Sequence, residues 1–254
     1  PIRVGTTLKS DEELRISENG YLGLVHVASG KPVEVKEAGS HRVSELASRI
    51  KKGATVLQQY TDFILSASSE KTNELTATGS VHRGPDQIHL LLPEPRQAVV
   101  YGDAVTVAWL NDAQTPVYIL RLSSMFGDEL DRIEVRDTTV SISLKGRKLN
   151  DEDNILIEVF SSDNENRKSE PHVIKKLSGA DKNRMRTSLV ELGEVTGEQT
   201  ALNQLVLASF FEQHSLLIDA ATAHYRAIEL EPDVSHFRDA YRRFLIRNGL
   251  LKGN

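Results

Sequence analysis

The chain has 254 residues, of which 39% are hydrophobic and 26% charged, and its formal net charge is -5. These values are typical of folded globular domains, and the length predicts two or three of them. The acidic balance argues against a general nucleic-acid binder, which needs a basic face. The absence of cysteine excludes disulfides, thiolate nucleophiles and zinc–thiolate sites.

Residues 1–65 are expected to form a small β domain with a helical extension. The segment 21-YLGLVHVASGKPVEV has two aliphatic runs around a Ser29-Gly30 turn, which predicts a β-hairpin, and 13-ELRIS predicts a strand that ends at a turn. From Ser44 onwards the apolar spacing becomes helical, and a second apolar stripe runs to Ile64. Residues 66–84 are small and polar, so we expect a linker there.

Residues 85–178 are expected to form a β-sandwich. Six short apolar runs follow one another with turn residues between them, namely 104-AVTVAW, 117-VYILRL, 132-RIEV, 139-TVSIS, 155-ILIEVF and 172-HVIKKL. Alternation places Val105, Val107 and Trp109 on one face, so Trp109 is predicted to lie in the core.

Residues 179–254 have helical periodicity. Met185, Leu189 and Leu192 mark one amphipathic helix, and further helices are predicted at 199–213, 216–230 and 234–247. Pro232 separates the last two helices, because proline cannot continue a helix from its interior. The fold class predicted for the whole chain is therefore multi-domain, mainly β with α-helices.

The first 45 residues resemble the repeat core of FecR-like domains, through 4-VGTTLKSDEELRISENGYLGLVHVASGKPVEV. The hairpin and the helix after it are similar to a variant found in envelope proteins of Bacteroidota-type bacteria. In this chain Thr6-Thr7 replaces the usual acidic residue, and Ser29-Gly30 replaces the usual Asp-Gly. The resemblance implies a periplasmic or cell-envelope location.

Residues 85–178 resemble a fibronectin type III or immunoglobulin-like sandwich, with Trp109 as the core tryptophan of an early strand. Ile155 stands where the usual corner tyrosine would be, which leaves the strand topology open.

Residues 201–232 resemble one tetratricopeptide repeat. The matching positions are Ala208, Phe211, Ala220, Ala227 and Pro232, and His224 stands where the repeat usually has an aromatic residue. Each such repeat buries its apolar face on a neighbour. We therefore expect this unit to pack on the helix around residues 181–194, which contains Met185, or on another chain.

No pattern predicts catalysis. The sequence lacks the phosphate-binding, dinucleotide-binding, HExxH and GxSxG motifs, and none of its eight histidines has the i, i+4 spacing of a helical metal site. The acidic run Asp151 to Asn154 lacks the glycine and the terminal glutamate of a calcium loop, so we interpret it as a solvated turn. The arginines near the C-terminus are interpreted as a solvated helix face rather than a polyanion site.

The sequence therefore predicts a non-catalytic scaffold of the cell envelope, with no cofactor and no metal, that binds other envelope proteins and no nucleic acid. Because the chain opens on Pro1, we expect that a targeting or anchoring segment has been removed, and that any membrane association depends on it. The alternatives are a FecR-like regulatory sensor and, as a second alternative, a cryptic hydrolase using Asp151 and Asp153. The partner-binding surface is predicted on the first helix of the helical hairpin, at Leu202, Leu205, Ser209, Glu212 and Gln213.

Overall fold

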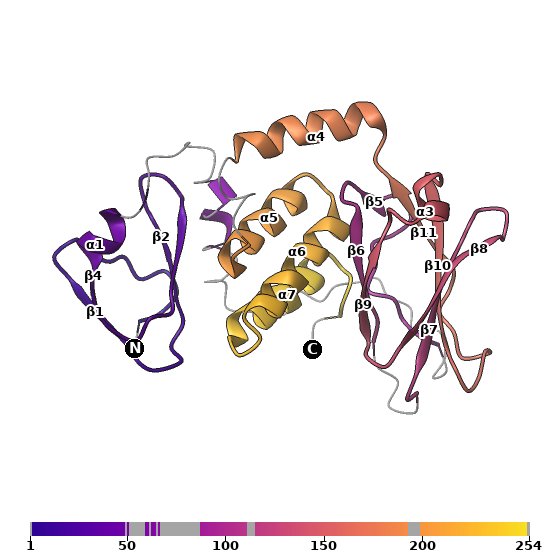
Figure 1. Cartoon of the computed structure of the whole chain (residues 1–254), viewed down its shortest axis with the longest axis horizontal. Helices are drawn as coiled ribbons and strands as arrows, with labels where there is room; N and C mark the ends of the chain where they lie inside the picture. Colours follow the sequence, from indigo (N-terminus) through magenta and orange to yellow (C-terminus); the bar gives the residue numbers. More distant parts are fainter. Residues whose placement is uncertain are drawn as a thin grey trace.

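The computed structural model describes residues 2–48, 50, 59, 60, 62–64, 66, 87–110, 115–192 and 199–252. The protein has a mixed β and α fold. Figure 1 shows a small β module at the N-terminal end, a group of helices in the middle and a larger β unit at the other end. The helices that close the chain thus lie between two β units that precede them in the sequence.

The N-terminal module consists of two antiparallel strand pairs and one short helix. Strand β1 (Glu13–Ile16) pairs with β4 (Gly39–Arg42), β2 (Leu22–Val25) pairs with β3 (Pro32–Val35), and α1 (Val43–Ser48) follows β4 directly. The predicted turns are present, with φ of 58° at Asn19 and 66° at Gly30. The buried residues Leu14, Ile16, Val35 and Leu46 form the core of this module.

The larger β unit contains two sheets. One has the strand order β5 (Val99–Val100), β11 (His172–Lys176), β10 (Asn154–Ser161), β7 (Tyr118–Ser123) and β8 (Glu129–Val135). The other pairs β6 (Ala104–Ala108) with β9 (Thr139–Ser143), and the short helix α3 (Arg147–Asn150) lies between β9 and β10. All pairs are antiparallel except β5 with β11. Each of the six strands predicted from the sequence is found.

The two sheets share one apolar core, as alternation along β6 predicts. Val105 and Val107 of β6 are fully buried, together with Ile155 of β10. Trp109 is 2% exposed, and its ring meets Tyr118 edge to face at a centroid distance of 5.3 Å. The prediction that Trp109 lies in the core is confirmed.

The helical unit contains α4 (Gly179–Glu191), α5 (Ala201–Gln213), α6 (Leu217–Leu230) and α7 (Ser235–Arg247). Side chains cap two of the helices, because the Ser178 hydroxyl accepts the Asp181 N–H and the Thr200 hydroxyl accepts the Asn203 N–H. Pro232 lies between α6 and α7, as predicted. Leu192 is buried, and Met185 and Leu189 of α4 pack on the same cluster as Phe210 of α5. The helix around Met185 thus covers part of the hairpin, as expected.

Aromatic residues of the last helices form much of this unit's core. Phe237 and Phe244 are fully buried, and the ring of Tyr241 stacks against that of Phe244. No helix in the described part of the chain is long and apolar enough to span a membrane.

Candidate functional site

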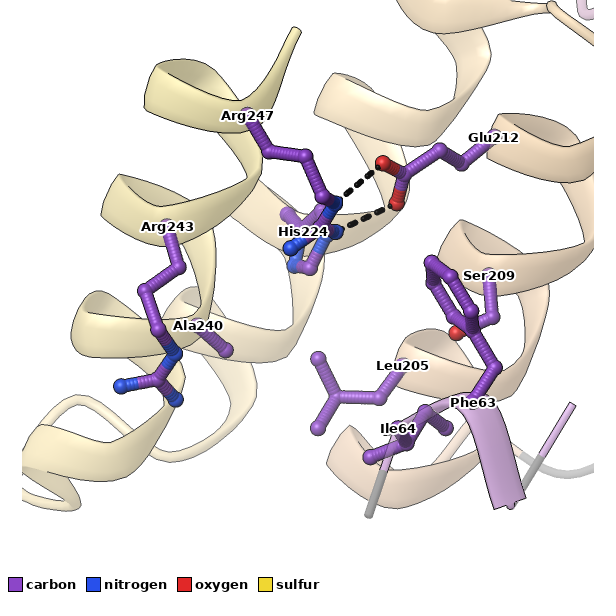
Figure 2. Close-up of a pocket in the computed structure, with 9 residues that line it drawn as sticks. All are labelled: Phe63, Ile64, Leu205, Ser209, Glu212, His224, Ala240, Arg243 and Arg247. Carbon is purple, nitrogen blue, oxygen red and sulfur yellow. Dashed lines mark hydrogen bonds and ion pairs between the residues drawn. The ribbon is translucent and has the colours of Figure 1, made fainter. Parts of the chain in front are cut away.

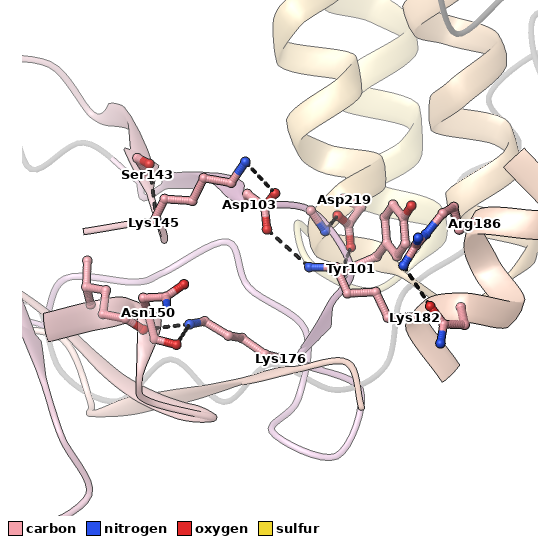
Figure 3. Close-up of polar contacts among 12 residues, drawn as sticks. Tyr101, Asp103, Ser143, Lys145, Asn150, Lys176, Lys182, Arg186 and Asp219 are labelled. Carbon is pink, nitrogen blue, oxygen red and sulfur yellow. Dashed lines mark hydrogen bonds and ion pairs between the residues drawn. The ribbon is translucent and has the colours of Figure 1, made fainter. Parts of the chain in front are cut away.

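The helical unit is joined to the sandwich through Asp219, on the first turn of α6. Its carboxylate accepts the backbone N–H of Tyr101 at 2.8 Å and of Gly102 at 2.7 Å, in the turn between β5 and β6 (Figure 3). Gly102 permits this approach, since a Cβ there would lie 2.9 Å from the carboxylate oxygen. Burial raises the pKa of Asp219 to about 6, and the two backbone hydrogen bonds act in the opposite direction.

The same helix continues this junction along β6. The hydroxyl of Thr222 accepts the backbone N–H of Thr106 at 2.9 Å, and Ile218 inserts into the core of the sandwich. Ala108 of β6 in turn belongs to the cluster that α6 and α7 form around Phe244. Because both cores contain residues of the other unit, the sandwich and the helical unit are joined by buried side chains as well as by hydrogen bonds.

Charged residues surround this junction at the surface. Asp103 binds Lys145 at 3.0 Å and Lys182 of α4 at 3.1 Å, and the hydrogen bond from Lys145 is the largest cause of a lowered pKa at Asp103. Figure 3 shows Lys182 reaching from α4 towards the turn that carries Tyr101. Both lysines share one carboxylate, so this set of three side chains keeps one net positive charge at the surface.

A second junction joins the helical unit to the N-terminal module. Glu34 of β3 accepts the backbone N–H of Leu202 at 2.7 Å and the hydroxyl of Tyr21 at 2.9 Å. The Tyr21 ring meets Phe237 of α7 edge to face at 5.5 Å, and burial is the largest cause of the raised pKa of Tyr21. Leu202 also packs against Gly23, where a Cβ would lie 3.0 Å from its side chain. The helical unit thus contacts both β units.

Residues 59, 60, 62–64 and 66, which we call the segment 59–66, are helical and lie on the helical unit. Tyr60 is 4% exposed and its ring contacts Phe210 of α5 at 5.5 Å. Ile64 packs on the clusters around Phe210 and around Phe237, and the guanidinium of Arg247 lies 5.3 Å from the centre of the Phe63 ring. The apolar stripe predicted to end at Ile64 is therefore helical in its described part, and it packs mainly on α5.

A pocket lies between α5 and α7, and we call it the α5–α7 pocket (Figure 2). Its enclosed volume is about 20 Å³, room for about one water molecule, and the rest of the hollow is open to solvent. The lining residues are Phe63, Ile64, Leu205, Ser209, Glu212, His224, Ala240, Arg243 and Arg247. The α5–α7 pocket therefore combines an apolar part, to which the segment 59–66 contributes, with a basic part on α7.

Glu212 and Arg247 close one end of the α5–α7 pocket. The guanidinium donates two hydrogen bonds to the carboxylate, at 2.8 and 2.7 Å, and the amide of Asn248 donates a third at 2.7 Å. Figure 2 shows the two bonds of this bidentate pair. Because the Glu212 side chain is only 9% exposed, the pair is screened less than a surface pair, and it leaves neither partner with spare charge.

His224 lies between α5 and α7 at the same pocket. The ring is 6% exposed and contacts the rings of Tyr241 and Phe244. Burial, with smaller effects from Arg247 and Arg243, lowers the pKa of His224 to about 3, so the imidazole is neutral at pH 7. Its Nδ1 is buried without a hydrogen-bond partner.

Arg243 supplies the charge that remains in the α5–α7 pocket. Its guanidinium has no hydrogen bond or ion pair to any residue in the described part of the chain, whereas Arg247 beside it is neutralised by Glu212. The hydroxyl of Ser209 also lines the pocket without an internal partner among the described residues. The α5–α7 pocket therefore places a cationic side chain and a hydroxyl beside apolar side chains, and a guanidinium of this kind attracts a carboxylate.

The five residues predicted to bind a partner lie at different places. Leu205 is 2% exposed in the core, and Leu202 packs on the N-terminal module. Ser209 and Glu212 line the α5–α7 pocket, where Glu212 is held by Arg247. Gln213 is exposed at the end of α5.

The residues tested for catalysis form no reactive set in the described ranges. Asp151 and Asp153 are exposed in the turn between α3 and β10, and no group of three His, Asp or Glu side chains among the described residues is placed to hold a metal ion. The Nδ1 of His26 lies 2.8 Å from the Ser29 hydroxyl, but Ser29 also accepts the Lys31 N–H inside a hairpin turn. We interpret this pair as part of the turn.

Sequence reasoning missed Asp219 and Arg243. An acidic residue in the first turn of a helix is ordinary, so no sequence signal distinguished Asp219. Arg243 was seen as one arginine of a solvated face, and only the position of α5 shows that it lines a pocket. No protein-family model matches the chain, and no curated protein matches its sequence.

Proposed function

We propose that the protein is a non-catalytic, protein-binding scaffold of a bacterial cell envelope, and that its helical unit is the partner-binding part. One observation carries the proposal. The helical unit is joined to both β units by partly buried hydrogen bonds, through Glu34 on one side and Asp219 on the other, and it carries a pocket lined by Arg243, which has no ion pair within the described ranges. A ligand bound there would be held at a fixed position relative to both modules.

Three features support the finer assignment of the modules. The two-sheet order, with β5 parallel to β11 at one edge, agrees with an immunoglobulin-like or fibronectin type III-like sandwich. The α5–α6 pair with His224 in its core agrees with a tetratricopeptide-like hairpin, and the β2–β3 hairpin followed by α1 agrees with the FecR-like variant. Modules of these three kinds commonly mediate contacts between proteins, which is an argument by analogy.

The test is affinity capture from the cell envelope of the source bacterium with three proteins. They are the wild type, Arg243→Glu, and Arg242→Glu as the matched control, because Arg242 is exposed on the same helix and does not line the α5–α7 pocket. We expect Arg243→Glu to lose partners that the wild type and Arg242→Glu retain. The same set of partners for all three proteins would remove the helical unit from the proposal.

A further inference from the structure

The segment 59–66 shows what kind of structure the helical unit can hold. Tyr60, Phe63 and Ile64 follow an i, i+3, i+4 spacing, so they project from one face of a helix. All three contact the helical unit, Tyr60 at Phe210 of α5, Ile64 at the α5 clusters and Phe63 at Arg247 of α7. Figure 2 shows Phe63 and Ile64 at the α5–α7 pocket, near Leu205 and Ser209 of α5.

The helical conformation of this segment depends on its contacts. A helix shorter than about 12–15 residues is marginal alone in water, because too few hydrogen bonds follow its costly first turn. Its face is held by the apolar contacts of Tyr60 and Ile64 and by the cation–π contact of Phe63 with Arg247. The surface therefore selects a helix by the side chains at these three positions.

The occupant leaves the α5–α7 pocket incompletely filled on the side of α7. The space there is lined by Ala240 and Arg243, and the guanidinium of Arg243 has no hydrogen bond or ion pair within the described ranges. Glu212 cannot neutralise it, since both of its oxygens are bound to Arg247. A longer helix that carries a carboxylate would satisfy this charge, whereas a basic helix would be repelled.

We propose that the α5–α7 pocket and the adjoining surface of α5 form a docking site for an amphipathic, acidic helix of a partner protein. That helix has aromatic residues at i and i+3 and an aliphatic residue at i+4, and it replaces residues 59–66, which are the chain's internal occupant. The inference rests on the proposed function, because it names the partner class for the same pocket. A tethered occupant acts at an effective concentration in the millimolar range, so the partner must displace it.

The experiment uses the full chain and a labelled synthetic peptide with the sequence of residues 56–68, followed by fluorescence anisotropy. In the opened variant, Tyr60→Ser with Ile64→Ser, the internal anchors are removed. We expect this variant to bind the peptide at least about tenfold more tightly than the wild type, because the tethered competitor is lost. The matched control is Asp62→Ser, at an exposed position on the same segment, which should bind as weakly as the wild type.

Two checks keep the result interpretable. The opened variant must keep the far-ultraviolet circular dichroism and the Trp109 fluorescence of the wild type. If it does not, Phe63→Ser with Ile64→Ser, which changes two half-buried residues, takes its place. A peptide with serine at its three anchor positions must not bind. Equal affinity of the opened variant and the wild type, or equal binding of the peptide without anchors, would overturn the proposal.

A second arm tests the charge preference with two peptides that share the anchors and carry glutamate or lysine at the remaining polar positions. We expect the acidic peptide to bind the opened variant several-fold more tightly. This preference should disappear with Arg243→Gln and persist with Arg242→Gln. No preference, or the same loss in both variants, would refute the role of Arg243. Peptide binding without any Arg243-dependent partner in envelope extract would refute the proposed function and leave the docking site standing.

Discussion

The carboxylate of Glu34 accepts the backbone N–H of Leu202 at 2.7 Å, and so connects residues that lie 168 positions apart. The same oxygen accepts the hydroxyl of Tyr21. Glu34→Ala removes the acceptor from both donors at once, and we expect it to lower the free energy of unfolding by about 1–3 kcal/mol. Chemical denaturation measures this change. Glu37→Ala, at an exposed position three residues on, is the control and should stay within about 0.5 kcal/mol of the wild type.

Asp219 should make stability depend on pH in a defined window. Its pKa is raised from 3.8 to about 6, so the folded protein holds this proton up to a higher pH than the unfolded chain does. The folded state binds more protons within that window, and the contribution of Asp219 to the free energy of unfolding therefore falls as the pH rises from about 4 to about 6.

Asp219→Asn should abolish this part of the pH dependence. Denaturant titrations of both proteins between pH 4 and pH 7 measure the difference. An unchanged slope in Asp219→Asn would contradict the raised pKa.

We predict that Trp109 is shielded from solvent quenchers and that its removal greatly lowers the free energy of unfolding. Because it is 2% exposed, acrylamide should quench its fluorescence only weakly in the native protein, and the chain has no other tryptophan to confuse the signal. Trp109→Ala should cost about 3–5 kcal/mol, since it leaves a cavity beside Tyr118. Strong quenching in the native protein would show that the core is placed wrongly.

In the turn between β7 and β8, we expect the exposed Phe126 side chain to contribute little to stability and the buried Ser124 hydroxyl to contribute more. Phe126 is 94% exposed, whereas the buried hydroxyl of Ser124 accepts the backbone N–H groups of Phe126 and Asp128, each at 3.2 Å. Phe126→Ser should change stability by less than about 0.5 kcal/mol, and Ser124→Ala should cost about 1–3 kcal/mol. Thermal unfolding of the two variants measures this contrast, and a larger loss in Phe126→Ser would indicate that its ring has an internal partner.

Local patterns predicted the elements whose side chains alternate or repeat. The six strands from Ala104 to Lys176 and the helices after Ser178 were found where periodicity placed them. Two strands were missed for a physical reason. β4 has the sequence Gly-Ser-His-Arg and no apolar alternation, and β5 has two residues, so both are strands only because β1 and β11 offer hydrogen-bonding edges.

The candidate site was harder to predict, because its residues are far apart in the sequence. Leu205, Ser209 and Glu212 were singled out from the hairpin alone, and all three line the α5–α7 pocket. Arg243 lines a pocket only because α5 lies beside α7, and Phe63 and Ile64 line it because they pack near α5. No periodicity within residues 56–64 indicates which distant surface receives its apolar face.

The contacts between the helical unit and the earlier parts of the chain can form only late in synthesis, because the helical unit is translated last. At about 5–20 residues per second, Leu202 is translated roughly 10–30 s after Glu34 of β3. During that time the Glu34 carboxylate lacks the Leu202 N–H that it accepts in the finished protein. Tyr21 and Tyr60 are likewise without the Phe237 and Phe210 rings that they contact in the finished protein. A chain that stops before α5 would therefore display these two tyrosines to chaperones and proteases, and translation through residue 237 is what withdraws them.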